Sequence, residues 1–374
     1  MIFSGPHRCF LGRFCCDRKF RHEKIIFTAI IKIMKQEYLV DVPVAVQIWI
    51  RPDNQRKQFE ILRQARPSTL LIISDGGRND EENRLIQLSR TMFETEIDWE
   101  CQVFSFYSDV NLGTYGCIRA MHEFVWSHVD RCIFLEDDIL PSVSFFRYCA
   151  ELLEKYKDDR RIYAICGMNH EGISEPAEHD YFFSRYGSIW GHAFWKRTYE
   201  QYYDYAYKNE PYTKSLIEKA AHDLMPGHDR QIDNVAKYGR YDGHEPGGEF
   251  FMNFMIYGQH QLLIIPKKNM ITNIGCDPSA AHASDLNNLP KGIRRVFNME
   301  RYELNFPLDH PKYVFPDTRY EAVRNRIMAY GHPLVRLYRN GETVYLNIKN
   351  GNGAYVKDRL SKIIRLKRGT FRED

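Results

Sequence analysis

The chain has 374 residues, of which 44% are hydrophobic and 27% are charged. This composition is typical of a globular protein and argues against a disordered, collagen-like or coiled-coil chain. The 52 Lys and Arg against 49 Asp and Glu leave a net charge of only +3, which argues against a dedicated nucleic-acid binder, so we expect no nucleic-acid partner.

Residues 1–40 form a basic N-terminal extension with 8 Lys or Arg and 3 Asp or Glu. Its longest apolar run, residues 25–31, is far shorter than the roughly 20 residues of a membrane span. No small-residue cleavage site closes the run, so a signal peptide is not expected. Two interpretations stay open: the extension lies on a membrane surface, or it is poorly ordered.

Strand and helix patterns alternate regularly from residue 42. Strands are predicted at residues 42–50, 70–73, 101–106 and 132–135. The first helix is expected to be capped by Asp53 or Asn54, the second to run through Leu85, Leu88 and Met92, and the third to run through Ile118–Val129. Because these strands are continuously apolar, the order predicts an α/β fold with a mostly parallel, Rossmann-like sheet and helices on both faces.

The pattern changes in the second half of the chain. A helix at residues 144–156 and a strand at 162–166 continue the first pattern. Residues 181–310 then mix short strands with Gly- and Pro-containing loops, which indicates a mixed α+β half. We therefore divide the chain into residues 1–40, 41–180, 181–310 and 311–374.

The nine cysteines are scattered, and no CxxC pair occurs among them. A zinc ribbon and a dense disulfide scaffold are therefore not expected. We interpret the cysteines as small buried hydrophobes in a reducing compartment.

Polar residues follow three of the predicted strands, at positions 51–53, 74–77 and 136–138. Parallel strands present their carboxyl ends at one edge of the sheet, and ligands bind beyond that edge. The three clusters are therefore predicted to converge on one site.

Glu136, Asp137 and Asp138 are the most specific feature of the sequence. Three successive carboxylates repel one another unless a cation or several donors lie beside them. A Mg²⁺ or Mn²⁺ ion held by one or two carboxylates and substrate phosphates meets that need. The alternative is an acidic turn that faces solvent.

The other two clusters predict contacts with a nucleotide. Asp75 can accept hydrogen bonds from a base or a ribose, and Gly76 permits close backbone approach. Arg51 can meet a diphosphate or a base. The alternatives are an ordinary turn for Asp75 and a surface salt bridge for Arg51.

Two later residues are candidates for chemistry. Glu249, beside glycines and aromatic residues, can act as a general base, or it simply favours a helix N-terminus. His282 can bind a metal or a phosphate, or it is a histidine of a surface loop.

Several common enzyme classes lack their motifs here. The chain contains no GxxxxGK[ST] and no GxGxxG that opens a helix after the first strand, which argues against a P-loop hydrolase and a dinucleotide oxidoreductase. Residues 187–191 do not match GxSxG, so no nucleophile elbow is present there.

Taken together, residues 44–309 resemble the GT-A nucleotide-sugar glycosyltransferases, and most closely the N-acetylglucosaminyltransferase I type and its bacterial hemolytic-protein-like relatives. The stretches that carry the resemblance stand in the expected order: residues 48–54, 72–77, 111–113, 134–138 with 145–146, 188–195, and 273–275 with His282. The resemblance implies a GT-A fold, with a nucleotide-sugar-binding half at residues 41–180 and an acceptor-side half at 181–310.

The resemblance also implies roles for individual residues. Asp75, with Gly76, would contact the nucleotide base, and Arg51 would help at the base or the diphosphate. Glu136 and Asp137 would face the ribose and the donor sugar, and Asp138, the last acid of this DxD-like motif, would bind the metal together with His282. Glu249 would be the catalytic base, while Trp190 and Gly191 would form a wall beside donor and acceptor.

The resulting hypothesis is a metal-dependent hexosyltransferase that uses Mn²⁺ or Mg²⁺ and a nucleotide-diphosphate sugar, with UDP as the expected nucleotide. A lone candidate base favours a single displacement and inversion. The acceptor would be a saccharide, lipid-linked or free, in the synthesis of a surface polysaccharide or glycoconjugate. The alternative is a catalytically silent module that binds sugar nucleotides or glycans.

The basic charges lie at the two ends of the chain. Residues 357–374 hold 7 Lys or Arg and 3 Asp or Glu, a net +4, and residues 1–40 carry +5, so residues 41–356 carry −6. The pattern Val356, Leu360, Ile363 and Ile364 predicts a basic amphipathic helix that contacts anionic lipid; the alternative is an ordinary surface helix. We expect a cytoplasmic, peripheral protein at the inner face of the membrane.

Overall fold

The computed structural model describes residues 35–205, 252, 255–276, 285–357 and 361. The first part of the chain contains β1 (Val40–Ile48), α2 (Pro52–Ala65), β2 (Pro67–Ser74), α3 (Asp80–Thr95), β3 (Gln102–Tyr107), α4 (Gly113–His128), β4 (Arg131–Leu135), β5 (Ile139–Pro141), α5 (Ser144–Lys155) and β6 (Ile162–Cys166). The second part contains β7 (Tyr181–Ser184), β8 (His192–Trp195), α6 (Lys196–Tyr205), β9 (Leu262–Pro266), β10 (Ile271–Asn273), the short 3₁₀ helix η1 (Leu286–Asn288), α10 (Lys291–Arg294), α11 (Thr318–Met328) and α12 (Pro333–Lys349).

Eight of these strands form one sheet in the order β3-β2-β1-β4-β8-β6-β9-β7. Strands β1 to β4 are parallel, β9 is parallel to β6, and β8 and β7 run antiparallel to their neighbours. The predicted α/β fold with a mostly parallel sheet is therefore confirmed. Strand β8 lies between β4 and β6, so the predicted halves 41–180 and 181–310 share one sheet.

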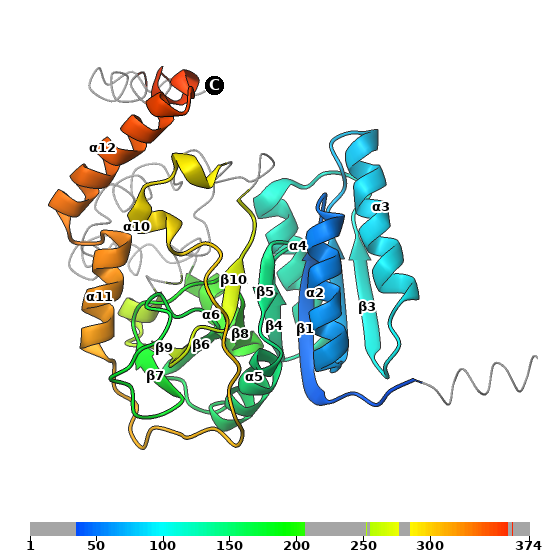
Figure 1. The fold of residues 1–374 in the computed structure, drawn as a ribbon. Helices are drawn as coiled ribbons and strands as arrows, with labels where there is room; N and C mark the ends of the chain where they lie inside the picture. Colours follow the sequence, from blue (N-terminus) through cyan, green and yellow to red (C-terminus); the bar gives the residue numbers. More distant parts are fainter. Residues whose placement is uncertain (1–34, 206–251, 253–254, 277–284, 358–360, 362–374) are drawn as a thin grey trace, which may run out of the picture.

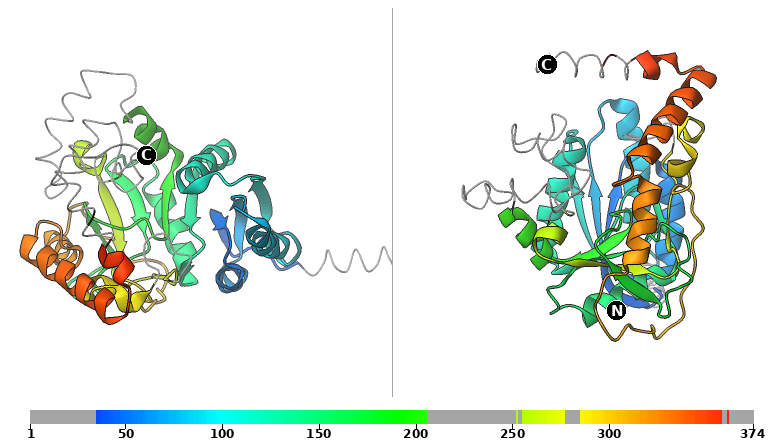
Figure 2. Two further views of the ribbon diagram at one scale, coloured as in Figure 1. Left: turned by 90° about the horizontal axis from the view of Figure 1, so that it is seen from above. Right: turned by 90° about the vertical axis from the view of Figure 1, so that its left-hand side faces the viewer.

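Helices cover both faces of the sheet, as predicted. Figures 1 and 2 show α2 and α3 on one face of β1–β3 and α4 on the opposite face. Right-handed crossovers require this arrangement, because β2 and β3 are added on one side of β1 and β4 on the other. The parallel strands β1, β2 and β4 are almost wholly buried at their centres.

The predicted helix through Leu85, Leu88 and Met92 is present as α3, whereas the predicted cap of the first helix is wrong. Helix α2 begins at Pro52, and its N-cap residue, Arg51, makes no side-chain capping bond. Proline suits the first turn because its missing N–H would have no partner there, so Asp53 lies inside the helix instead of capping it. In α3 the buried apolar residues are Ile86, Met92 and Phe93, whereas Leu88 is half exposed.

The six cysteines in the described residues are free thiols. Cys132, Cys149 and Cys166 are buried in the core, and burial raises the pKa of each thiol. For these three, the predicted role as small buried hydrophobes is confirmed. Along the part of the chain that the structure describes, no helix has both the length and the apolar character that a membrane crossing requires.

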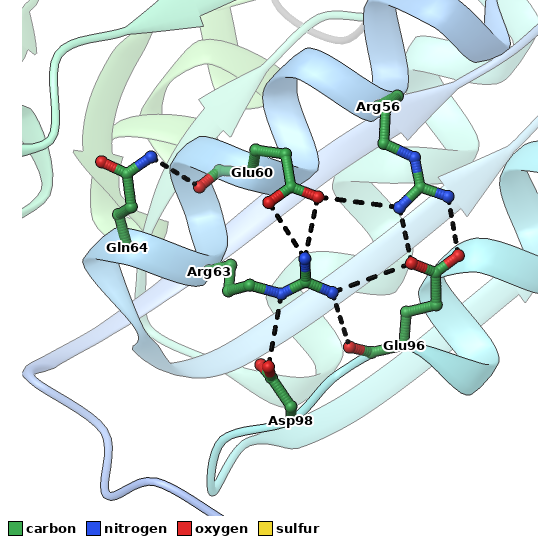
Figure 3. Close-up of polar contacts among 6 residues, drawn as sticks. All are labelled: Arg56, Glu60, Arg63, Gln64, Glu96 and Asp98. Carbon is green, nitrogen blue, oxygen red and sulfur yellow. Dashed lines mark hydrogen bonds and ion pairs between the residues drawn. The ribbon is translucent and has the colours of Figure 1, made fainter.

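A cluster of charged residues joins α2 to the segment that follows α3 (Figure 3). Arg56 donates to both carboxylate oxygens of Glu96, at 2.5 and 2.6 Å. Arg63 donates to Glu60 at 2.8 Å and to the backbone oxygen of Glu96 at 3.3 Å. The Arg63 guanidinium also lies 4.8 Å from the ring centroid of Phe59, which adds a cation–π contact.

We predict that Glu96→Gln lowers the free energy of unfolding by about 0.5–1 kcal/mol at pH 7, the magnitude expected for a half-exposed ion pair. The hydrogen bond from Arg56 lowers the pKa of Glu96 in the folded state. The contribution of the pair is therefore present above the unfolded pKa, about 4.3, and is lost as the pH falls through the lowered value. Urea unfolding at pH 7 and near pH 2 checks this, with Glu100→Gln as the exposed control. An equal loss at both pH values would contradict the prediction.

Candidate functional site

The acidic turn, residues 136–138, links β4 to β5 at the carboxyl edge of the sheet. The Ile139 N–H donates to the Glu136 carbonyl at 3.2 Å, and the Ile274 N–H donates to the Asp138 carbonyl at 2.9 Å. Strand β5 also pairs with β10, with Ile139 opposite Asn273. The turn is therefore tied to the segment 273–275, which lies far away in the sequence.

Arg51 supplies a positive charge to this turn. Its Nη1 lies 3.0 and 3.2 Å from the two carboxylate oxygens of Asp137 and 3.6 Å from Oδ2 of Asp138. The three side chains are only 11–16% exposed. Two of the three predicted clusters thus meet, and a guanidinium offsets the repulsion between adjacent carboxylates. Arg51 thus forms a salt bridge, but a largely buried one within the candidate site instead of the surface pair that was its alternative.

Two buried glutamines of α2 hold the backbone of the turn, one directly and one through the other, and the sequence analysis missed both. Gln58 is fully buried in α2 and donates to the carbonyls of Glu136 and Ile139, at 2.9 and 2.8 Å. Gln55, also fully buried, donates to Gln58 Oε1 and to the Gln47 carbonyl, each at 3.3 Å. The sequence does contain a clue to them: two amide side chains three residues apart lie on the helix face that also carries Phe59 and Leu62.

Gly275 contacts Asp138 so closely that no side chain fits there. A Cβ at position 275 would lie 1.9 Å from Oδ2 and 2.6 Å from Cγ of Asp138. The Gly275 N–H donates to Asn273 Oδ1 at 2.8 Å. The glycine therefore allows the Asp138 carboxylate to lie against the backbone of the second half of the chain.

Asp75 organises the neighbouring loop at the end of β2. It is 7% exposed, and its Oδ1 accepts hydrogen bonds from the N–H groups of Gly76 and Leu112, at 2.9 and 2.8 Å. Asn111 donates to its Oδ2 at 3.2 Å. A Cβ on Gly76 would lie 2.5 Å from the carbonyl carbon of Val110, so this glycine is required for close approach of the two loops. The structure thus shows a loop-organising role for Asp75, and base contact stays a prediction.

An aromatic ring and a guanidinium lie at the same edge of the sheet. Trp49 follows β1, and Arg78 Cζ lies 5.0 Å from the centroid of its ring. The Trp49 Nε1 atom is buried without a hydrogen-bond partner among the described residues. The sequence analysis missed this pair, although both residues flank the polar clusters after β1 and β2.

Trp190 and Gly191 lie beside the strands that follow the acidic turn. Gly191 has a φ of +58°, and a Cβ there would lie 2.4 Å from Cδ1 of Ile271 in β10 and 3.3 Å from Cγ2 of Ile139 in β5. The Trp190 ring is half-buried and lies 5.2 Å from the ring of Phe297. The role of Trp190 and Gly191 as a wall beside donor and acceptor stays a prediction.

Glu249 and His282 lie outside the described residues, so their predicted roles stay predictions. Among the residues that the structure does describe, no group of three or more His, Cys, Asp or Glu could hold a metal ion. Asp137 and Asp138 nevertheless offer carboxylate oxygens, the ligands that Mg²⁺ and Mn²⁺ prefer, and one or two carboxylates suffice when substrate phosphates complete the site. Binding of a divalent ion to the acidic turn together with a diphosphate stays a prediction.

Two histidines near β4 are ruled out as cations at neutral pH. Burial lowers the pKa of His192 to about 4 and that of His122 to about 3. Both rings pack against Phe134 and Phe194. They therefore serve as neutral aromatic members of the core.

No family model and no curated protein sequence matches the chain. Among solved structures, the mannosyltransferase PcManGT from Pyrobaculum calidifontis, in complex with GDP-Man and Mn²⁺, is 12% identical over 50% of this chain and 55% of its own, with a TM-score of 0.31. The apo form of the glycosyltransferase GlyE from Streptococcus pneumoniae is 11% identical over 65% and 57%, with a TM-score of 0.25. Mannose-1-phosphate geranyltransferase from Thermus thermophilus is 12% identical over 62% and 76%, with a TM-score of 0.22.

This chain spans little more than half the length of the first two of these structures. All three TM-scores lie below 0.5. The likenesses are therefore too distant to assign a site residue or a reaction to this chain, and the function has to be argued from its own residues.

We predict that Gly275→Ala lowers the free energy of unfolding by about 1–3 kcal/mol, because the new methyl group overlaps the Asp138 side chain. Removing that side chain with Asp138→Gly in the same protein should recover part of the loss. Gly341→Ala is the control, since a Cβ at position 341 meets nothing within 4 Å. Urea denaturation of the single and double variants measures the coupling. Strictly additive effects would show that the two residues do not touch.

Proposed function

We propose that this chain is a metal-dependent glycosyltransferase that moves a sugar from a nucleotide-diphosphate donor, expected to be a UDP-sugar, to a saccharide acceptor. The observation that carries the proposal is the pair Asp137 and Asp138, which Arg51 contacts at the carboxyl edge of a parallel sheet. Ligands of such sheets bind at that edge. The acceptor class, lipid-linked or free, in the synthesis of a surface polysaccharide or glycoconjugate, is part of the proposal.

In this proposal Asp138 holds Mn²⁺ or Mg²⁺, which would supply positive charge to the diphosphate leaving group, and Asp137 faces the donor sugar. The carboxylates have to keep one orientation when the donor arrives. Arg51 restrains both of them through its Nη1, and Gly275 lets Asp138 lie against the second half of the chain. A preorganised charge of this kind costs little reorganisation during the reaction.

The donor nucleotide would lie over the ends of β1 and β2. Asp75 and Asn111 form a polar loop there. The Arg78 guanidinium lies over one face of the Trp49 ring, so a base would stack on the other face. Aromatic faces stack on planar bases. Glu136 faces the ribose in this proposal, and Trp190 borders the sugar.

The acceptor hydroxyl has to lose a proton as it attacks the anomeric carbon. Glu249 is the proposed general base, and His282 is proposed as a further metal ligand. Attack from the face opposite the leaving diphosphate would invert the anomeric centre.

The proposal predicts release of nucleoside diphosphate from a sugar nucleotide in the presence of Mn²⁺, measured across a panel of donors. Asp138→Asn keeps the shape of the side chain but removes its charge, and should lower the rate more than about a hundredfold, because metal binding and leaving-group stabilisation are both weakened. Asp158→Asn is the control, since Asp158 is an exposed aspartate after α5. Activity that survives chelation and Asp138→Asn would contradict the metal-dependent mechanism.

A second prediction concerns stereochemistry. If Glu249 is the base of a single displacement, proton NMR of the product should show an anomeric configuration opposite to that of the donor. A product with the donor's configuration would contradict the inverting mechanism while leaving the transferase proposal intact.

One observation favours the alternative, a silent module that binds sugar nucleotides or glycans. Arg51 already supplies a cation to both Asp137 and Asp138, so the acidic pair can remain folded without a metal. A silent module would bind sugar nucleotides equally well with and without Mn²⁺, and would release no nucleoside diphosphate. Calorimetric titration beside the release assay separates the two functions.

A further inference from the structure

Helix α12 presents apolar side chains to solvent. The exposed members are Leu334 (79%), Leu337 (69%), Tyr338 (72%), Tyr345 (61%) and Ile348 (60%). At 100° per residue they fall on one stripe about 100° wide along the helix. We call these five residues the α12 stripe. The figures show that α12 lies beyond α11, at the side of the molecule opposite β3 (Figure 1).

The opposite side of α12 is held to the body through polar contacts. Asn347 is 2% exposed and donates to the Asn288 carbonyl at 3.2 Å. Arg339 donates to the Arg326 carbonyl at 3.2 Å and packs against Gly292. A surface helix ordinarily turns its apolar face to the core, whereas α12 turns its apolar stripe to solvent. The α12 stripe therefore contributes little to the fold, and its exposure indicates a binding surface.

The sequence over residues 333–374, which includes α12, is strongly positive. Residues 333–357 contain four Lys or Arg and one Glu. Of these, Lys349 flanks the α12 stripe and Lys357 follows the helix, and both are exposed, whereas Arg336 and Arg339 fall on the opposite side of the helix. Residues 358–374 add six Lys or Arg and three acidic residues. From 333 to 374 this makes ten basic and four acidic residues, a net charge of +6, in a chain whose total is +3.

We propose that the α12 stripe binds an anionic lipid surface. Leu334, Leu337 and Ile348 would enter the acyl boundary, and the two tyrosines suit the headgroup level because each ring has a polar tip. Lys349 and Lys357 would contact the lipid phosphates, and each Lys or Arg near an anionic surface adds roughly 1 kcal/mol. Apolar burial and basic charge together are the two signals that a stable peripheral contact requires.

This proposal is independent of the proposed transferase activity. It also moves the membrane contact that the sequence predicted at residues 356–364 toward α12, whose exposed side chains the structure describes. The competing occupant is a second copy of the chain, since a leucine- and tyrosine-bearing stripe can also pair with itself. Dense positive charge on both partners opposes that pairing, whereas it favours an anionic bilayer.

The experiment is sedimentation of the full chain with vesicles of phosphatidylcholine alone and of phosphatidylcholine mixed with phosphatidylglycerol. We expect binding to the mixed vesicles only, weakened by added salt. The triple variant Leu337→Ser, Tyr338→Ser, Ile348→Ser should lower the affinity about tenfold or more, through the lost apolar burial. The matched control is Leu88→Ser, Tyr313→Ser, Phe315→Ser, which removes three side chains that are 50%, 64% and 73% exposed elsewhere.

Circular dichroism shows whether both triple variants fold, and because all six positions are exposed, both should. Equal vesicle binding by the two triple variants would overturn the proposal. So would a wild-type chain that ignores vesicles but forms a dimer that the α12 triple variant dissociates, as measured by analytical ultracentrifugation. Nucleoside diphosphate release without vesicles is measured separately, so failure of one proposal does not affect the other.

Discussion

The ion pair between Arg51 and the consecutive carboxylates Asp137 and Asp138 is the constraint on which the site depends. Two adjacent acids at the end of a buried strand repel each other, and partial burial makes that repulsion more costly. Arg51 offsets it from the end of β1, the strand that pairs with β4. The parallel pairing of these two strands thus brings the opposite charges together.

The same turn is also the place where the two halves of the chain meet. Gln58 of α2 holds its carbonyls from one side, and Gly275 lies against Asp138 from the other. The pairing of β10 with β5 holds the segment that contains Gly275 beside the acidic turn. A ligand bound at Asp138 would therefore contact a position determined by three separate segments, which gives a rigid support for the chemistry proposed above.

The parallel half of the fold could be predicted because its strands are buried on both faces. Continuous apolar runs separated by helical periodicity admit few other arrangements. The second half was less predictable, since β8 enters the sheet between β4 and β6 and nothing local in the residues 192–195 indicates that position. The predicted cap at Asp53 or Asn54 was wrong because Pro52 already starts helix α2.

The sequence by itself determined that acidic, basic and glycine-rich clusters would gather at one edge of a parallel sheet, because strand direction alone places them there. Tertiary structure decided which of them touch. Arg51 pairs with the acidic turn, whereas Asp75 holds the loop that follows β3. It also decided that Gln58 and Gly275 support the turn and that the apolar side of α12 faces outward. Such contacts join residues far apart in the chain, and local pattern carries no information about them.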